Sequence, residues 1–281
     1  MRIRTLIIAV VCLCMIGGLV AGLFSHSIQA ALTVQNANAA HQANGAAPQP
    51  TVTRGGVNGT GNGNGQPVKT TTPAPVKSPT NVANGANVLA QDTFQRMAQT
   101  FWGSASDGRL WAGDANSIEV FSIATGAGQI DHAQGAFNAM LGPQITNVEV
   151  LVTVNVNHFA AGGTVNVGAA LRWKDGNNWY KALIDGTKLQ ILSRVNGVTT
   201  SLASMPFAAK DGTTYNLRFR ALGANLFARA WQSGQPEPAT WMLTVANTAL
   251  TQGLGGVRVL VLNTTVIRVT AFLETSVAPV E

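Results

Sequence analysis

The sequence predicts an all-β domain, built as an antiparallel sandwich of two sheets. Residues 165–204 alternate between apolar and polar side chains as four consecutive strands, and such alternation buries one face of each strand. Short strands of this kind recur about every 8 to 12 residues beyond Leu89. Asp-Gly and Asn-Gly favour the positive φ angles of tight hairpin turns. They occupy three of the breaks: Asp175-Gly176, Asp185-Gly186 and Asn196-Gly197.

The rest of the chain beyond Leu89 is expected to supply the second layer of the sandwich. Upstream of the four strands we expect a short strand in 89–96, a hairpin in 118–131 and a strand in 147–157. The last of these has valines on one face: Val148, Val150, Val152, Val154 and Val156. Downstream strands are predicted in 213–222, 225–232, 236–245, 256–263 and 265–274.

Helices have little support in the domain. No segment there has the apolar periodicity of an amphipathic helix, and residues 247–253 form a short turn at most. Large aromatic residues are expected in the core, namely Trp102, Trp111, Trp173 and Trp241.

Charge divides the chain near residue 89. The net charge is +6, yet no acidic residue precedes Asp92, and the first 91 residues hold only 5 of the 18 basic ones. The part from Asp92 onward therefore has 13 basic residues against 12 acidic ones. A nearly neutral domain has no charge excess to attract nucleic acid, so we expect no nucleic-acid partner.

The N-terminus predicts export. Two arginines in residues 1–4 precede an uncharged apolar run at 5–24, long enough to cross a bilayer, and a cleavage site is available after Ala30. Residues 1–30 are therefore a signal peptide or an uncleaved membrane anchor. The domain is then secreted, or tethered to the outer face of the cytoplasmic membrane. Both cysteines, Cys12 and Cys14, lie in the apolar run, which leaves the domain without a disulfide.

Residues 31–88 are rich in Asn, Gly, Thr and Pro and contain no aromatic residue. Such a composition predicts a disordered linker. The predicted organisation is thus 1–30, 31–88 and a folded domain at 89–281, which is expected to be a monomer.

A family resemblance rests on DTFQR, WGSASDGRLW, ALRWKDGNNWYKALIDGTKLQILSRVNGVTTSLAS and YNLRFRALGANLFARAWQSGQPEPATWMLT. Together these resemble the concanavalin A-like lectin/glucanase (laminin G-like jelly-roll) modules of bacterial exported proteins, over residues 91 to 275. The resemblance implies a jelly roll, and the family includes lectins, adhesion modules and glycosidases. Related modules close on an acidic FDDF-like strand that, with an acid such as Asp92, can hold calcium. Here that strand reads VIRVTAFLE. Structural calcium is therefore doubtful, and no cofactor is expected.

Catalytic chemistry has little support. Glycosidases of this fold have a motif that resembles E-x-D-x-x-E on one strand, because retaining hydrolysis needs two carboxyl groups close together. The sequence contains no such motif. Glu119 and Glu149 stand alone on predicted strands and are expected to face solvent. His132 and His158 are expected to be surface residues. We expect no enzyme, with a divergent glycoside hydrolase as the weakest alternative.

The leading hypothesis is a binding module for carbohydrate or cell-surface glycan. Sugar sites combine aromatic rings with hydrogen-bonding side chains, and the hairpin around 175–178 brings such residues onto neighbouring strands. The candidate ligand residues are Arg172, Trp179 and Lys181. Arg218 with Arg220, and Arg229 with Trp231, also share strand faces. The competing interpretation is a structural or adhesive surface domain that binds protein, in which these side chains are core or ordinary solvent-facing residues.

Overall fold

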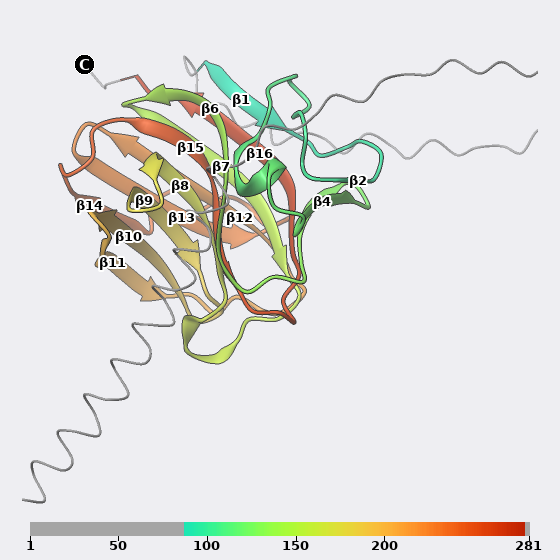
Figure 1. Cartoon of the computed structure of the whole chain (residues 1–281). Coiled ribbons are helices and arrows are strands. Elements are labelled where there is room, and N and C mark those ends of the chain that lie inside the picture. The colour runs from blue at the N-terminus through green and yellow to red at the C-terminus, as the bar shows by residue number, and fades with distance from the viewer. Residues whose placement is uncertain (1–86, 279–281) are drawn as a thin grey trace, which may run out of the picture. The chain divides into compact units, whose positions relative to one another are not determined.

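The computed structural model describes residues 87–278, which form an antiparallel sandwich of a nine-stranded and a seven-stranded sheet (Figure 1). The predicted all-β, two-sheet architecture is confirmed for this part of the chain. The predictions for residues 1–30 and for 31–86 lie outside the described residues, and β1 begins at Val88, within the predicted linker. No helix in the described part is long and apolar enough to cross a membrane.

The nine-stranded sheet contains the chain ends of the domain. In spatial order its strands are β14 (Leu243–Ala246), β13 (Asn225–Gln232), β12 (Thr214–Leu222), β7 (Val148–Val156), β16 (Ile267–Ser276), β5 (Ala127–Ile130), β4 (Phe121–Ala124) and β2 (Gln99–Thr100). Strand β1 (Val88–Asp92) pairs with the second half of β16. The first half of β16 pairs with β5.

The seven-stranded sheet contains the predicted four-strand meander as consecutive neighbours. Its order is β11 (Val198–Pro206), β10 (Lys188–Val195), β9 (Asn178–Ile184), β8 (Asn166–Asp175), β15 (Gly253–Val261), β6 (Gly135–Ile145) and β3 (Ala112–Gly113). Figure 1 shows β9, β10 and β11 in succession at the left of the domain. Two short 3-10 helices complete the described elements: η1 (Asp114–Asn116) and η2 (Ala161–Gly163).

Two of the three predicted turn dipeptides have the expected backbone. Asn196 and Gly197 both have positive φ, at 48° and 82°, and Gly186 has φ 89°. Gly176 does not have positive φ, so the β8–β9 connection uses another geometry. That connection is instead fastened by Asp175, whose carboxylate accepts hydrogen bonds from the Asn177 N–H and the Asn178 amide.

The core lies between the inner faces of the two sheets. All five valines predicted to share a face of β7 are there, each at most 1% exposed. Tyr180, Ala182 and Ile184 of β9 belong to the same core and come from the other sheet. An aromatic cluster closes one end of this core, with Trp111 packed edge-on against Trp102 and Phe272. Trp102 and Trp111 are buried as expected, whereas Trp173 and Trp241 are only half-buried, so their assignment to the core was wrong.

One carboxyl group is enclosed in this apolar core. Glu274 of β16 is fully buried, and neither carboxyl oxygen has a hydrogen-bond partner in the described residues. It lies where glycines leave room, since a Cβ on Gly142 or Gly255 would overlap its oxygens. Burial raises the pKa of Glu274 to about 8, and the charge of Arg109 only partly opposes this. At neutral pH the group is therefore mainly protonated.

Glu274→Gln should remove a pH dependence of stability. Since the pKa of Glu274 is raised in the folded state, its proton stabilises the fold at low pH. That contribution is lost as pH rises from about 4.5 to about 8. We expect the free energy of unfolding of the unmodified chain to fall over this range by on the order of a few kcal/mol, and that of the variant to stay nearly level.

Urea unfolding at several pH values measures this slope. Exposed Glu119→Gln is the control and should keep the original slope. An unchanged slope in Glu274→Gln would show that another group causes the pH dependence.

Candidate ligand-binding site

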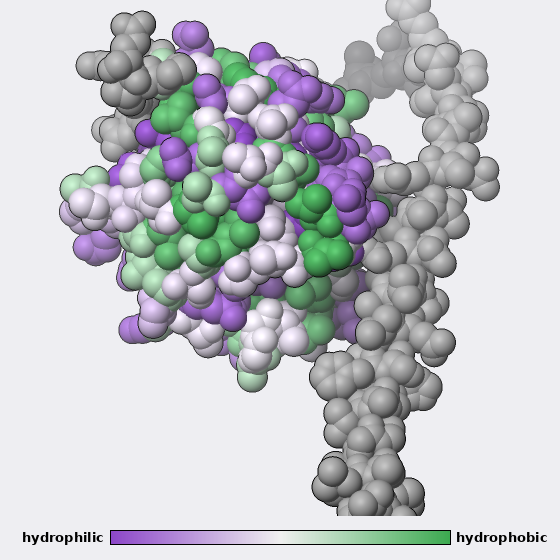
Figure 2. Space-filling model, turned by 90° about the vertical axis from the view of Figure 1, so that its left-hand side faces the viewer, coloured by the Kyte–Doolittle hydropathy of each residue, from purple (hydrophilic) through white to green (hydrophobic). Residues whose placement is uncertain are grey.

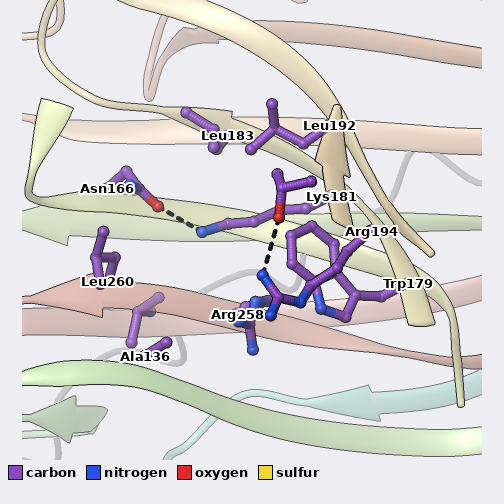
Figure 3. A pocket seen from close by; sticks show the side chains of 11 residues that line it. Ala136, Asn166, Trp179, Lys181, Leu183, Leu192, Arg194, Arg258 and Leu260 are labelled. Carbon is purple, nitrogen blue, oxygen red and sulfur yellow. Dashed lines mark hydrogen bonds between the residues drawn. The ribbon is translucent and has the colours of Figure 1, made fainter. Parts of the chain in front are cut away.

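A hollow of about 150 Å³ opens on the outer face of the seven-stranded sheet (Figure 3). Its side chains come from β6, β8, β9, β10, β11 and β15. They are Ala136, Asn166, Trp179, Lys181, Leu183, Leu192, Arg194, Thr199, Arg258, Val259 and Leu260. Apolar cavities of about this volume hold one small ring, so the hollow is of a size for one sugar residue or a similar group.

The pleat of β9 places two of the predicted site residues here. Because Tyr180, Ala182 and Ile184 enter the core, the alternate residues Trp179 and Lys181 must lie on the outer face. Yet both are only 3% exposed, so β9 is buried on both faces. Both nevertheless line the hollow.

Trp179 supports a guanidinium group. Its indole Nε1–H donates to the Gly176 carbonyl oxygen at 3.0 Å, which fixes the ring against the β8–β9 turn. The Arg258 Cζ atom lies 4.5 Å from the ring centroid, a cation–π geometry visible in Figure 3. Arg258 covers the ring, so Trp179 contributes chiefly by positioning this arginine and not as an open stacking platform.

Lys181 lies across the adjacent strand. A Cβ on Gly168 of β8 would come within 2.9 Å of the lysine Cε, so the stem needs a glycine there. Its Nζ donates to Asn166 Oδ1 at 2.5 Å, and Asn166 is oriented by its own donation to the Gly163 carbonyl. Burial, reinforced by the positive charge of Arg258, holds the pKa of Lys181 well below its usual value.

Arg258 is the second cation of the hollow and is half-buried. It donates through Nη1 to Asn138 Oδ1, and the same asparagine donates to Asp114 from its backbone and its side-chain nitrogen. Asp114 thus lies behind Asn138 and forms no ion pair with Arg258 among residues 87–278. Burial and the charge of Arg194 lower the pKa of Arg258 to about 10.

Arg194 stands at the rim of the hollow. Its Nη1 donates to Thr199 Oγ1 at 3.0 Å, and its Nε is buried without a partner in the described residues. Leucines form the apolar part of the lining: Leu183, Leu192 and Leu260. The hollow therefore combines apolar surface with N–H donors.

Arg172 lies elsewhere, which corrects its assignment to this face. It is 1% exposed and donates to three backbone carbonyls, those of Thr146, Leu250 and Gly223, at 2.7 to 3.1 Å. The cause is a register shift in β8 after Leu171, where Arg172 itself has φ 50°. Such a bulge re-aims the side chain. Arg172 consequently joins three loops at one end of the sandwich and does not line the hollow.

The outer face of the nine-stranded sheet holds a closed ion-pair network. Glu149 is 4% exposed and is paired with Arg218 and Arg220, so the expectation that it faces solvent was wrong. Glu237 lies 2.6 Å from both Arg218 Nε and Arg229 Nη2. The half-buried Trp241 lies against the guanidinium groups of Arg220 and Arg229. The arginine pairs noted in the sequence are thus neutralised within the chain.

The remaining candidates for chemistry do not form a site. Glu119, His132 and His158 are exposed, and His158 contacts the Asp211 carboxylate at 2.7 Å. The Asp92 carboxylate accepts from Arg96 and from the Trp111 indole. In the described region no group of three potential metal ligands comes together.

Arg258 and Asn166 were missed by the sequence-based reasoning. A signal for Arg258 was present, since it is a lone charge between Val257 and Val259 on a strand of alternating pattern. Asn166 gave none, because an asparagine at a strand start usually indicates a turn.

Comparison with known proteins gives fold-level matches. No protein-family model and no curated protein matches the sequence. The xylan beta-1,4-xylosidase from Bacillus halodurans C-125 matches with 13% identity and a TM-score of 0.50, covering 66% of this chain and 39% of that one. The GH43 protein BlXynB from Bacillus licheniformis gives 12% identity, the same TM-score and the same coverage.

A carbohydrate-binding module, CBM66 from Bacillus subtilis, matches with 14% identity and a TM-score of 0.46, covering 57% of this chain and 94% of the module. At such identities the likeness to the Bacillus halodurans xylosidase and to BlXynB is one of fold. The chain therefore shares a β-sandwich fold with part of those enzymes and spans well under half their length.

Replacing Arg172 should cost stability. Arg172→Met leaves three carbonyl oxygens without their buried donor, so we expect a loss of about 2 to 4 kcal/mol in the free energy of unfolding. Lys174→Met, an exposed residue of the same strand, is the matched control and should change it by less than about 0.5 kcal/mol. Urea unfolding compares the two, and a loss no larger than that of the control would contradict the loop-joining role of Arg172.

Proposed function

We propose that this chain is an exported, non-catalytic binding module that recognises carbohydrate in the hollow of the seven-stranded sheet. The observation that carries the proposal is the lining. Apolar surface from Leu183, Leu192 and Leu260 lies beside the N–H donors of Lys181, Arg194 and Arg258. Sugars present apolar CH faces and hydroxyl groups together, and this mixture of surfaces suits both.

The resemblance to concanavalin A-like modules supports the same proposal. Export rests on the apolar run at 5–24, which would also tether the domain to a membrane if it is not removed. The absence of a paired-carboxylate motif from the sequence is the reason for proposing a binding module and not a hydrolase.

A protein-binding role has less support from the surface. Figure 2 shows one face of the domain, on which hydrophobic residues form small patches separated by hydrophilic ones. The large exposed apolar side chains of the described region are scattered, being Val88, Met97, Leu110 and Val198. Protein interfaces more often use one contiguous apolar patch.

A glycan array with the full chain tests the function, and variants test the site. Leu192→Trp places an indole in the hollow and should reduce affinity for the strongest array glycan at least about tenfold, because it occupies the sugar's place. Gln190→Trp adds the same ring two residues away on the same face of β10, outside the lining, and should stay within about twofold.

The outcomes separate the hypotheses. Equal affinity of both variants would place the glycan elsewhere. An array without glycan binding, together with release of reducing sugar from polysaccharide, would favour the hydrolase alternative. If the array shows no glycan binding and no reducing sugar is released, the carbohydrate proposal is overturned.

A further inference from the structure

The two cations of the hollow, buried Lys181 and half-buried Arg258, have no carboxylate in direct contact in the described residues, and Asp114 acts on Arg258 only from behind Asn138. Neither Lys181 nor Arg258 forms an ion pair within residues 87–278, and no lining residue there is acidic. Lys181 Nζ has a neutral amide oxygen as its partner, and so has Arg258 Nη1. Arg194 adds a third positive charge at the rim.

The opposite face of the sandwich shows how this chain neutralises buried cations. There each of three arginines lies 2.6 Å from a carboxylate oxygen of Glu149 or Glu237. Burying a charge without a counter-charge costs several kcal/mol, and like charges nearby add to the cost. Arg172 shows that a single buried arginine can be satisfied by carbonyl oxygens alone, through four hydrogen bonds. Lys181 and Arg258 differ from it because two cations lie near each other, so that their repulsion adds to the cost of burial.

Neighbouring side chains position the two cations at the wall of the hollow. The Arg258 guanidinium lies over the Trp179 ring, and Asn166 accepts a hydrogen bond from the end of Lys181, the bond drawn in Figure 3. These contacts leave further N–H donors on each cation, since an ammonium has three and a guanidinium five. A guanidinium with an ammonium nearby matches the oxygens of a carboxylate, sulfate or phosphate.

We propose that the hollow selects an acidic sugar, whose anionic substituent is bound by Lys181 and Arg258 while its ring contacts the leucines. This inference rests on the proposed function and adds the class of glycan. A uronate carboxylate and a sulfate ester share the required chemistry.

Proton uptake should accompany binding. An anion beside Lys181 raises its depressed pKa, so a proton should be taken up on binding, and affinity should fall, as the pH rises through the pKa of Lys181 in the free protein. The charged groups that face Lys181 are Arg258 on β15 and Arg194 on β10, with Asp114 of η1 behind Asn138.

The test uses pairs of glycans that differ only in charge. The full chain is titrated by calorimetry with tetragalacturonate and with its methyl ester, and with chondroitin and chondroitin sulfate tetrasaccharides. We expect at least about tenfold tighter binding of an acidic member than of its neutral or less charged partner, and the first and second pairs distinguish carboxylate from sulfate. Measured in two buffers of different ionisation heat, the same titration gives the proton uptake.

Variants connect the preference to the two cations. Lys181→Met and Arg258→Gln should each reduce the charge preference at least about tenfold, and Lys181→Met should abolish the proton uptake. Lys174→Met and Arg268→Gln make the same changes of charge outside the hollow. These two control variants should keep the preference for acidic glycans and the proton uptake. Lys181→Met removes the cost of a buried charge but also removes the donor to Asn166 Oδ1, so the Tm of every variant is measured to show that it is folded at the titration temperature.

Two results would overturn the inference in different ways. If neutral glycans of an array bind at the hollow as tightly as acidic ones, the carbohydrate function stands and the selection for acidic sugars is wrong. If no glycan of either kind binds, the proposed function fails and the inference fails with it.

Discussion

The pleat of β9 is the constraint on which the arrangement of this domain depends. Tyr180, Ala182 and Ile184 must point into the core between the two sheets for the sheets to bury their inner faces. Trp179, Lys181 and Leu183 are then forced outward, at positions set by the same backbone. Packing of the core thus fixes the floor of the hollow, and a shift of one residue in register would exchange the two sets.

Charged side chains are paired differently on the outer faces of the two sheets. On the nine-stranded sheet, carboxylates and arginines neutralise one another, and Trp241 packs against the guanidinium groups. On the seven-stranded sheet, two cations are desolvated beside each other with amide oxygens as their partners. The first arrangement is complete within the chain, whereas the second has no carboxylate in direct contact in the described residues, which is why our proposal places an anionic ligand there.

Local pattern predicted most of the fold. Alternation identified β7 to β11 and the valine face of β7, because each strand's pattern lies within a few neighbouring residues. The position of Arg172 could not be predicted in this way, since the bulge after Leu171 depends on β8 fitting against Gly253, where a Cβ would lie 2.4 Å from the Arg172 carbonyl carbon. The enclosure of Glu274 likewise depends on residues distant in sequence: Gly142 is more than a hundred residues away, and Gly255 is about twenty residues away.

The candidate site was only partly predictable for the same reason. Trp179 and Lys181 could be placed on one face from their spacing, but their burial depends on Arg258, Asn166 and Gly168 from two neighbouring strands. Glu149 is expected to face solvent when its strand is considered alone, and its burial follows from arginines about seventy residues away. Long-range pairing of charges leaves no local pattern.

The position of bound ligand on the two sheets tests the central claim most directly. Tetragalacturonate, or the strongest acidic glycan of the array, is titrated into the isotope-labelled full chain while the tryptophan indole N–H signals are followed by NMR. The account predicts that the Trp179 indole signal shifts, with the amides of β9 and β15, because Trp179 lies under Arg258 in the hollow. A shift of the Trp241 indole with an unchanged Trp179 would place the ligand on the nine-stranded sheet and contradict it.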